Sequence, residues 1–284
     1  MGITAEKLIL DLVFAATEQT ITAKAAVVVA RLFDITDNSV RVALARLQAR
    51  GLLERSGRGR YALAAGAWPL QRHVASWSRL EERRVAWRGE WVGVYLSRPT
   101  HIGRQPARRR RRALELLGLE ALEPGLWVRP DNLRGGVSGL RTQLGELGLD
   151  ERSRVFVLGG FDAATEAEAR GLWDGAALRA AHRDMTRRLK QSGLGLQKLD
   201  PERRLVESFL VGGQAINLLA FDPLLPEEIV AAKPRLALAD QMRHYDRLGR
   251  ACWREYAQQQ SIPEIVLPSE RSVRDDRAGG SKGG

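Results

Sequence analysis

Residues 36–63 read T-D-N-S-V-R-V-A-L-A-R-L-Q-A-R-G-L-L-E-R-S-G-R-G-R-Y-A-L, and this stretch decides the fold of the first part of the chain. Thr36 and Asp37 are typical helix-starting residues, because their side-chain oxygens can accept hydrogen bonds from the free N–H groups of a first turn. Apolar residues follow at helical spacing: Val40, Ala43, Leu44 and Leu47. Gly51 then favours a helix end. The pattern predicts an amphipathic helix with one apolar face.

Two short strands are expected after this helix. Residues 52–55 and 61–63 read as a pair, and the basic, glycine-containing stretch 56–60 is the turn between them. Upstream, Thr22 has the character of an N-cap in front of a helix over 23–33. An earlier helix is expected to bury Leu8, Ile9, Leu12 and Val13. Three helices and a hairpin in this order predict a winged helix-turn-helix.

A winged helix-turn-helix predicts double-stranded DNA as the partner. The second helix of the turn lies in the major groove, where Arg pairs with guanine and Asn with adenine. Arginines of the hairpin contact phosphates or the minor groove. The predicted DNA-binding residues are Thr36, Asn38, Ser39, Arg41, Val42, Arg46, Arg55, Arg58 and Arg60. The alternative is a small helical domain with a solvated basic face, or a protein-interaction module.

The charge of the chain supports a polyanionic partner. The 284 residues carry a net charge of +11, and 44% of them are hydrophobic, which is typical of a globular protein. Residues 1–66 hold nine Lys/Arg and six Asp/Glu, a net +3, whereas residues 67–112 hold twelve Arg and three Glu, a net +9. The remaining residues sum to −1, so the excess positive charge lies in the first two fifths of the chain.

Cysteine, histidine and hydropathy patterns narrow the class of protein. Cys252 is the single cysteine, so the chain forms no internal disulfide, which fits a reducing cytoplasm. Glu6, Lys7 and Asp11 interrupt the first apolar run, and no run reaches membrane-spanning length. The histidines lack partners at metal-ligand spacing: His73, His101, His182 and His244. We therefore expect a cytoplasmic protein that is not an enzyme, with no catalytic residue, metal, cofactor or membrane contact.

The middle of the chain alternates strands and helices. Strands are expected over 90–97, 126–129 and 155–158, with helices over 106–117 and 137–147 between them. This order favours a small α+β sandwich of the ferredoxin-like type.

A mostly helical region follows, with helices expected over 173–190, 205–219 and 235–260. Trp68-Pro69 is expected to interrupt a connector that joins the first two domains. The fold class is therefore α+β, with a winged helix-turn-helix, a ferredoxin-like domain and a C-terminal helical domain. The expected bounds are 1–66, 67–86 for the connector, 87–163, 164–262, and 263–284 for a tail expected to be disordered.

Three blocks of sequence occur in an order that points to a family. The first spans S-V-R-V-A-L-A-R-L (39–47) and G-R-Y-A-L (59–63), and the second is L-W-V-R-P-D-N-L (126–133). The third is D-P-L-L-P (222–226), with M-R-H-Y-D-R-L-G-R-A-C-W (242–253) after it. Over roughly residues 5 to 257, the chain resembles the PaaX family of bacterial transcriptional regulators.

The resemblance implies the same three-part architecture, with a central fold similar to the small ribonuclease of CRISPR spacer acquisition. It also implies a homodimer that represses an operon for the catabolism of an aromatic acid such as phenylacetate. The implied effector is phenylacetyl-CoA or another acyl-CoA, which releases the repressor from DNA. Family members tend to carry Trp-x-Gly after the D-P-x-L-P turn, whereas this chain has A-A-K-P-R at 231–235. A free aromatic acid therefore stays open as an effector.

Five polar residues are candidates for effector binding. The run 108–112 is all arginine and can grip either DNA phosphates or the phosphates of a CoA effector. Arg129 and Asn132 flank the end of a strand, where a ligand can bind. A solvated helix start and an Asx-type turn are the respective structural alternatives. The candidates are Arg108, Arg109, Arg112, Arg129 and Asn132.

Two other functions remain open from the residues alone. A metal-dependent nuclease built on the ferredoxin-like domain would need an acidic residue at a strand end, for which Glu90 and Asp162 are the nearby candidates. A constitutive DNA-binding protein without an effector is the other possibility.

Overall fold

A computed structural model describes residues 2–16, 18–96 and 104–262, with the main chain alone at 104–106. The fold is mixed α+β, with two small antiparallel sheets. The chain divides into two compact units, the first formed by residues 1–71, 189–213 and 244–284, and the second by 72–188 and 214–243. The predicted tail at 263–284 lies outside the described residues.

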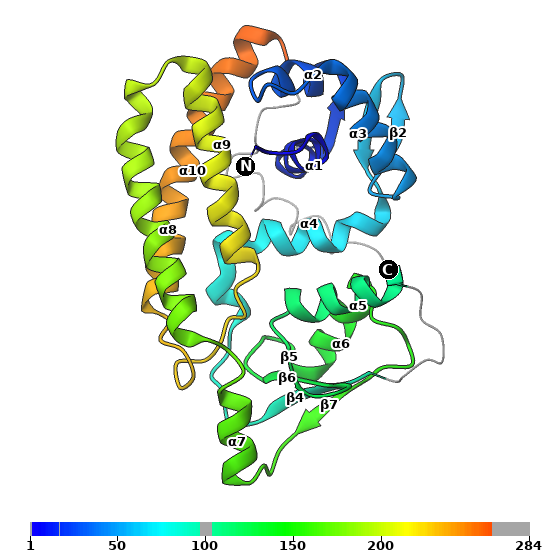
Figure 1. The fold of residues 1–284 in the computed structure, drawn as a ribbon, viewed down its shortest axis with the longest axis vertical. Coiled ribbons are helices and arrows are strands. Elements are labelled where there is room, and N and C mark those ends of the chain that lie inside the picture. The colour runs from blue at the N-terminus through cyan, green and yellow to red at the C-terminus, as the bar shows by residue number, and fades with distance from the viewer. Residues whose placement is uncertain (1, 17, 97–103, 263–284) are drawn as a thin grey trace, which may run out of the picture. The chain divides into compact units, whose positions relative to one another are not determined.

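The first unit begins with three helices and three short strands, several of which are labelled in Figure 1. Their bounds are α1 Ala5–Ala15, β1 Thr20–Thr22, α2 Ala23–Arg31, α3 Asp37–Ala49, β2 Leu53–Gly57 and β3 Arg60–Leu63. The strands form an antiparallel sheet in the order β1-β3-β2. The predicted caps are confirmed, since Thr22 Oγ1 accepts from Ala25 N at 3.1 Å and Thr36 Oγ1 from Ser39 N at 3.2 Å. Gly51, with φ +65°, follows the end of α3 as predicted.

The core of the first unit contains every residue that the helical spacing placed inside. The predicted inner residues of α1 and α3 are all at most 5% exposed: Leu8, Ile9, Leu12, Val13, Val40, Ala43, Leu44 and Leu47. Residues from later segments complete the same core: Leu205, Trp253, Ala257 and Ile262. Phe209 joins them, with its ring 5.4 Å from that of Phe33. The predicted domains are contiguous stretches of chain, whereas this core is not.

Two features of the first sheet differ from the expectations. Strand β1 was not predicted, because three residues are too short to show an apolar alternation. The predicted turn at 56–60 is too long, since Ser56 and Gly57 belong to β2 and Arg60 belongs to β3. An irregular register between Arg55 and Gly57 accommodates the extra residue.

The second sheet has four antiparallel strands in the order β5-β6-β4-β7. Its elements are β4 Trp91–Tyr95, α5 Arg104–Leu116, β5 Glu120–Glu123, β6 Leu126–Pro130, α6 Gly136–Leu147 and β7 Arg154–Leu158. The three predicted strands and two predicted helices are confirmed, and β5 is an additional strand. Helices α5 and α6 lie on one face of the sheet (Figure 1). On the other face, the indole of Trp91 stacks 6.3 Å from that of Trp173.

The connector is helical, which the sequence did not predict. It contains α4 (Trp68–Ala75), preceded by the 3-10 helix η1 (Ala65–Ala67) and followed by η2 (Ser76–Arg83). The expected break at Trp68-Pro69 is wrong, because this dipeptide begins α4. Proline in a first helical turn costs no hydrogen bond, since that N–H has no acceptor within the helix.

Helical segments make up most of the remaining chain. Their bounds are α7 Ala163–Arg170, α8 Gly175–Gly195, η3 Leu196–Lys198, α9 Pro201–Ala220 and α10 Lys233–Gln260. The three long helices are confirmed; α9 and α10 extend beyond the predicted bounds, whereas α8 begins two residues later and ends five residues later than predicted. Within the described ranges, no helix combines the length and the apolar character needed to cross a membrane.

Candidate nucleic-acid interface

The nine predicted DNA-binding residues all have exposed side chains. They come from the N-cap and outer face of α3 and from β2, β3 and the turn that joins them. Even Val42, the one apolar member, is 41% exposed, although α3 buries Val40, Ala43, Leu44 and Leu47. The amphipathic pattern of α3 therefore leaves a polar face open to solvent beside a basic hairpin.

The first turn of α3 is held by local hydrogen bonds. Thr36 Oγ1 lies 2.9 Å from Ser39 Oγ in addition to accepting the Ser39 N–H, so both side chains serve the cap. Arg31 donates to both carboxylate oxygens of Asp37, at 3.0 and 3.3 Å, and this hydrogen bonding lowers the pKa of Asp37. Among the described residues, Asn38 and Arg41 have no side-chain hydrogen bond or ion pair. These two side chains are therefore available to a ligand of α3.

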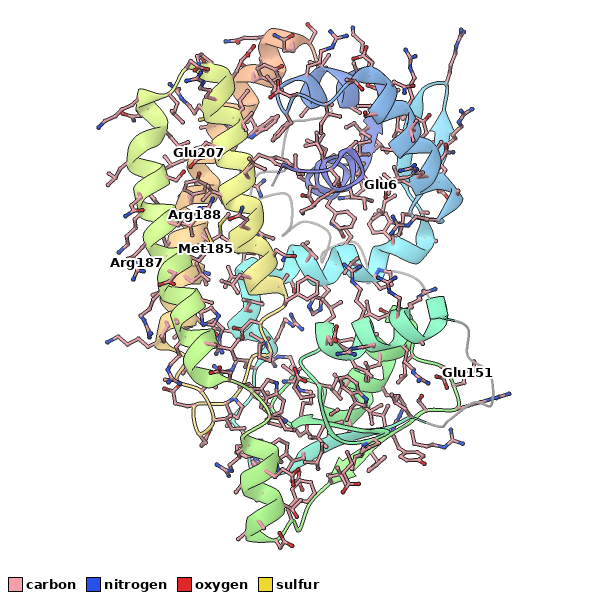
Figure 2. The ribbon with its side chains drawn as sticks, in the orientation of Figure 1. Glu6, Glu151, Met185, Arg187, Arg188 and Glu207 are labelled. Carbon is pink, nitrogen blue, oxygen red and sulfur yellow. The ribbon has the colours of Figure 1, made fainter. Side chains whose placement is uncertain are left out.

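The last turns of α3 are tied to α1 by a carboxylate. Arg50 Nη1 donates to Glu6 Oε2 at 2.7 Å. Arg46 Nη1 lies 3.7 Å from the other carboxylate oxygen, Glu6 Oε1. Figure 2 labels Glu6, which lies on α1 beside α3. Arg50 was missed as a candidate, although its position four residues after Arg46 places both on one face of the helix.

The hairpin contributes three arginines with different degrees of pairing. Arg60 is close to Thr20 Oγ1 at 3.4 Å and to Glu18 at 3.8 Å. Arg55 and Arg58, in contrast, make no side-chain hydrogen bond or ion pair with any described residue. The tip of the hairpin therefore presents positive charge that no described carboxylate neutralises.

The arginines of α5 form a separate basic surface in the second unit. Arg110 pairs with Asp150 at 3.4 Å and Arg111 with Glu115 at 2.7 Å. The exposed Arg109 donates to the Leu147 carbonyl at 3.4 Å. Arg108 and Arg112 are exposed and have no hydrogen bond or ion pair among the described residues. Being four residues apart, they share one face of α5.

The other two effector candidates, Arg129 and Asn132, are buried. Arg129 is 2% exposed and donates to Asn132 Oδ1 at 2.9 Å and to the carbonyls of Leu117, Pro130 and Pro223. Asn132 Nδ2 donates to the Leu224 carbonyl at 2.7 Å. Burial, followed by the charge of Arg83, lowers the pKa of Arg129 to about 9. Among the described residues, no hydrogen bond joins Arg129 or Asn132 to Arg108, Arg109 or Arg112.

A buried ionic cluster, which the sequence did not reveal, lies next to this pair. Asp222 sits 2.8 Å from His182 Nε2 and 3.4 Å from Arg235 Nη1, with all three side chains at most 3% exposed. Arg235 Nε also donates to Glu81 at 3.1 Å. These residues come from α8, the segment after α9, α10 and η2. The D-P-L-L-P turn was the sequence signal that could have indicated Asp222, because an Asp before Pro often accepts a hydrogen bond from the backbone two residues later. Leu224 N donates in this way to Asp222 Oδ1 at 2.8 Å.

Of the two acidic residues that a nuclease would use, Asp162 caps a helix and Glu90 is exposed. Asp162 is the N-cap of α7 and accepts from Thr165 N at 2.7 Å, which lowers its pKa. Glu90 precedes β4 and is exposed. In the described part of the chain, no group of three or more His, Cys, Asp or Glu side chains is arranged to hold a metal ion.

Comparison with known proteins gives a match among solved structures. No family model matches the chain, and no curated protein matches it. Among solved structures, the chain is similar to the uncharacterized protein Rv0674 from Mycobacterium tuberculosis, with 25% sequence identity and a TM-score of 0.51. The match covers 88% of this chain and 98% of the other, so it extends over both units.

Proposed function

We propose that this protein is a sequence-specific, DNA-binding transcriptional regulator. The observation that carries the proposal is the combination of an exposed polar face on α3 with Arg55 and Arg58 of the adjoining hairpin, which no described carboxylate pairs. Asn38 and Arg41 offer the donors that read base edges, and Arg55 and Arg58 offer charge to the phosphates. The buried apolar face of α3 fixes this arrangement on a rigid scaffold.

The order of elements supports a winged helix-turn-helix for this region. The chain runs α1-β1-α2-α3-β2-β3, with α2 and α3 separated by residues 32–36. Strand β3 lies between β1 and β2, so the hairpin is anchored to the segment in front of α2. In such modules, α3 would be the recognition helix and the β2–β3 hairpin the wing.

The second sheet supports the rest of the PaaX-like architecture. The order β4-α5-β5-β6-α6-β7, with β4 and β6 in the middle of the sheet, supports a ferredoxin-like domain. We therefore propose a cytoplasmic PaaX-like homodimer that represses an aromatic-acid catabolic operon. Phenylacetyl-CoA or another acyl-CoA would release it from DNA, with Arg108, Arg109 and Arg112 as candidates for contacting the CoA phosphates.

Selection of binding sites tests the DNA-binding proposal. The full-length protein is mixed with random-sequence duplexes, bound duplexes are enriched over several rounds, and the recovered site is footprinted. We expect a recovered motif with half-sites about one helical turn apart, as a dimer requires. Arg187, an exposed arginine on α8 paired with Asp184, provides the control, because Arg187→Ala removes one positive charge from an element other than α3 and the hairpin. Failure to enrich any motif, with equal binding to all duplexes, would overturn sequence-specific recognition.

A separate experiment tests the effector. Labelled duplex bound to the protein is titrated with phenylacetyl-CoA, with phenylacetate, and with free CoA as the control. Release by the acyl-CoA alone supports the proposed effector, whereas release by phenylacetate alone identifies a free acid. If none of the three changes the bound fraction, the regulator does not respond to this class of ligand.

A further inference from the structure

Val42 is an apolar side chain on the open face of α3. It is 41% exposed, and it is the most exposed of the large apolar side chains described between residues 2 and 63. The other valine of the helix, Val40, is completely buried in the core of the first unit. The helical period accounts for the burial of Val40, but it does not explain why a valine also stands on the opposite side.

The stability of α3 does not account for this valine. A β-branched side chain loses rotamer freedom in a helix, so alanine and long polar residues are favoured at exposed helical positions. Ala45 and Ala49, which are also exposed, follow this preference. Valine at position 42 therefore disfavours the helix without adding to the core. A contact with a partner would offset this cost, and the stiff side chain would lose little conformational freedom in making it.

The neighbours of Val42 on this face are polar or basic. Asn38 lies four residues before it and Arg46 four residues after it, so the three side chains share one side of the helix. Asn38 makes no side-chain hydrogen bond among the described residues. The single acidic residue of α3, Asp37, is already paired with Arg31. A partner that fits this face therefore combines negative charge and acceptors with a small apolar group.

The major groove of DNA offers this combination. Its rims are phosphates, and each thymine presents a C5 methyl group at the base edge, beside the acceptor O4. Apolar side chains can contact this methyl group. A protein partner would instead favour a larger apolar or aromatic cluster, whereas the other exposed residues of α3 are polar, basic or alanine. The face thus matches a base edge better than it matches a protein surface.

We propose that Val42 selects a thymine in the major groove by packing against its C5 methyl group. This role rests on the proposed function and adds a chemical preference to it. Four helical residues span about 6 Å, and successive base pairs are about 3.4 Å apart. The thymine should therefore lie within about two base pairs of the base that Asn38 contacts. Because a contact between methyl groups involves no charge, the preference for thymine should be the same at low and high salt.

Replacement of thymine by deoxyuridine provides the test, since it removes only the methyl group. Each thymine of the site recovered by selection is replaced in turn, in one half-site at a time, and affinity is measured by fluorescence anisotropy with the full-length protein. We expect one position at which the unmodified protein loses affinity about fourfold, the effect of one methyl group. With Val42→Ala, the same replacement should change affinity less than about 1.5-fold.

Val85→Ala is the matched control. Val85 is 42% exposed and lies outside α3 and the hairpin, so its replacement removes the same two methyl groups from another surface. This variant should keep the fourfold preference for thymine. Alanine favours a helix more than valine does, so Val42→Ala should fold, and its melting temperature should be no lower than that of the unmodified protein.

Two results would overturn the role of Val42 while leaving the proposed function intact. In the first, a motif is recovered but contains no thymine whose methyl group affects affinity. In the second, deoxyuridine weakens the unmodified protein and Val42→Ala equally, which would show that the methyl group acts on the shape of the DNA. Failure to recover any motif would instead overturn the proposed function and, with it, the role of Val42.

Discussion

The carboxylate of Asp222 lies 2.8 Å from Nε2 of His182, and both side chains are almost completely shielded from solvent. The other oxygen of Asp222 accepts the N–H of Leu224 and faces Arg235 Nη1. One buried carboxylate therefore holds a turn in place while it faces basic groups from two helices. A charge in this position is costly to leave uncompensated, and this property leads to the first prediction.

Asp222→Asn should strongly destabilise the protein. The substitution leaves the buried guanidinium of Arg235 without its buried counter-charge, and the loss of one partner of a buried pair costs about 3–5 kcal/mol. Urea unfolding measures the change in the free energy of unfolding. Asp240→Asn is the matched control, because Asp240 pairs with Arg243 on the surface of α10 and its side chain is 74% exposed. The control should lose less than about 1 kcal/mol; equal losses would contradict a structural role for the buried pair.

Gly118→Ala should be more damaging than Gly89→Ala. Both glycines have positive φ, +72° and +87°, so each substitution introduces strain of about 1 kcal/mol. A Cβ at Gly118 would also lie 2.7 Å from Cα of Pro223, whereas one at Gly89 would have no atom within 4 Å. The clash should add about 1–3 kcal/mol, which urea unfolding of both variants can resolve. Equal stability of the two variants would show that Pro223 moves away freely.

His73 should make stability depend on pH between 6.5 and 4. Burial, followed by the charge of Arg83, lowers the pKa of His73 from 6.5 to about 4 in the folded protein. Between these values the unfolded chain binds the proton more readily, so stability present above pH 6.5 is lost as the pH falls to 4. The shift corresponds to about 3 kcal/mol.

Unfolding at several pH values in His73→Gln tests this dependence. The glutamine amide can still donate to the Ala220 carbonyl, which lies 2.8 Å from His73 Nε2, but it does not titrate. The variant should therefore lose less stability on acidification than the unmodified protein. The control is His244→Gln, which replaces an exposed histidine. A parallel pH dependence for His73→Gln and the unmodified protein would rule out His73 as the titrating group.

The two classes of arginine in the proposed interface should respond differently to substitution. Arg41→Ala should reduce discrimination between bases at one position of the recovered site by about 1–3 kcal/mol. Arg58→Ala should weaken binding to all duplexes alike and reduce the slope of log affinity against log salt by about one. Fluorescence anisotropy with matched and single-mismatch duplexes separates these effects. If both variants lose affinity uniformly, the assignment of base reading to Arg41 is wrong.

Much of the first unit follows from local pattern. The spacing of Val40, Ala43, Leu44 and Leu47 predicts both the helix and its buried face, because the same 3.6-residue period governs both. Exposure of Arg41 and Val42 follows from the same spacing. Strands β1 and β5 were missed, because strands of three or four residues owe their formation to pairing with a neighbour.

The buried ionic cluster could not be predicted, because its contacts are distant in sequence. Arg129 reaches the Pro223 carbonyl across 94 positions, and Arg235 reaches Glu81 across 154. An arginine in a strand or a helix normally indicates a solvated position, since its charge is rarely buried. Only the tertiary structure brings carbonyls and carboxylates next to Arg129 and Arg235, and these partners offset the cost of burying the two charges. The R-P-D-N segment at 129–132 was recognised as polar and turn-forming, but its link to the D-P-L-L-P turn was not.

The ion pairs of Glu6 with Arg46 and Arg50 should weaken the binding of a polyanion to the last turns of α3. Arg46 and Arg50 are already neutralised in part by its carboxylate, so a phosphate that binds them must first compete with an internal anion. Such an exchange frees fewer counterions than binding to an unneutralised arginine, and its free-energy gain is correspondingly smaller. No described carboxylate pairs with Arg55 or Arg58, so a phosphate can bind them without displacing an internal anion. The surface therefore combines two kinds of arginine. Arg55 and Arg58 can bind any phosphate, whereas Arg46 and Arg50 bind one only where the new contacts outweigh the loss of their ion pairs with Glu6.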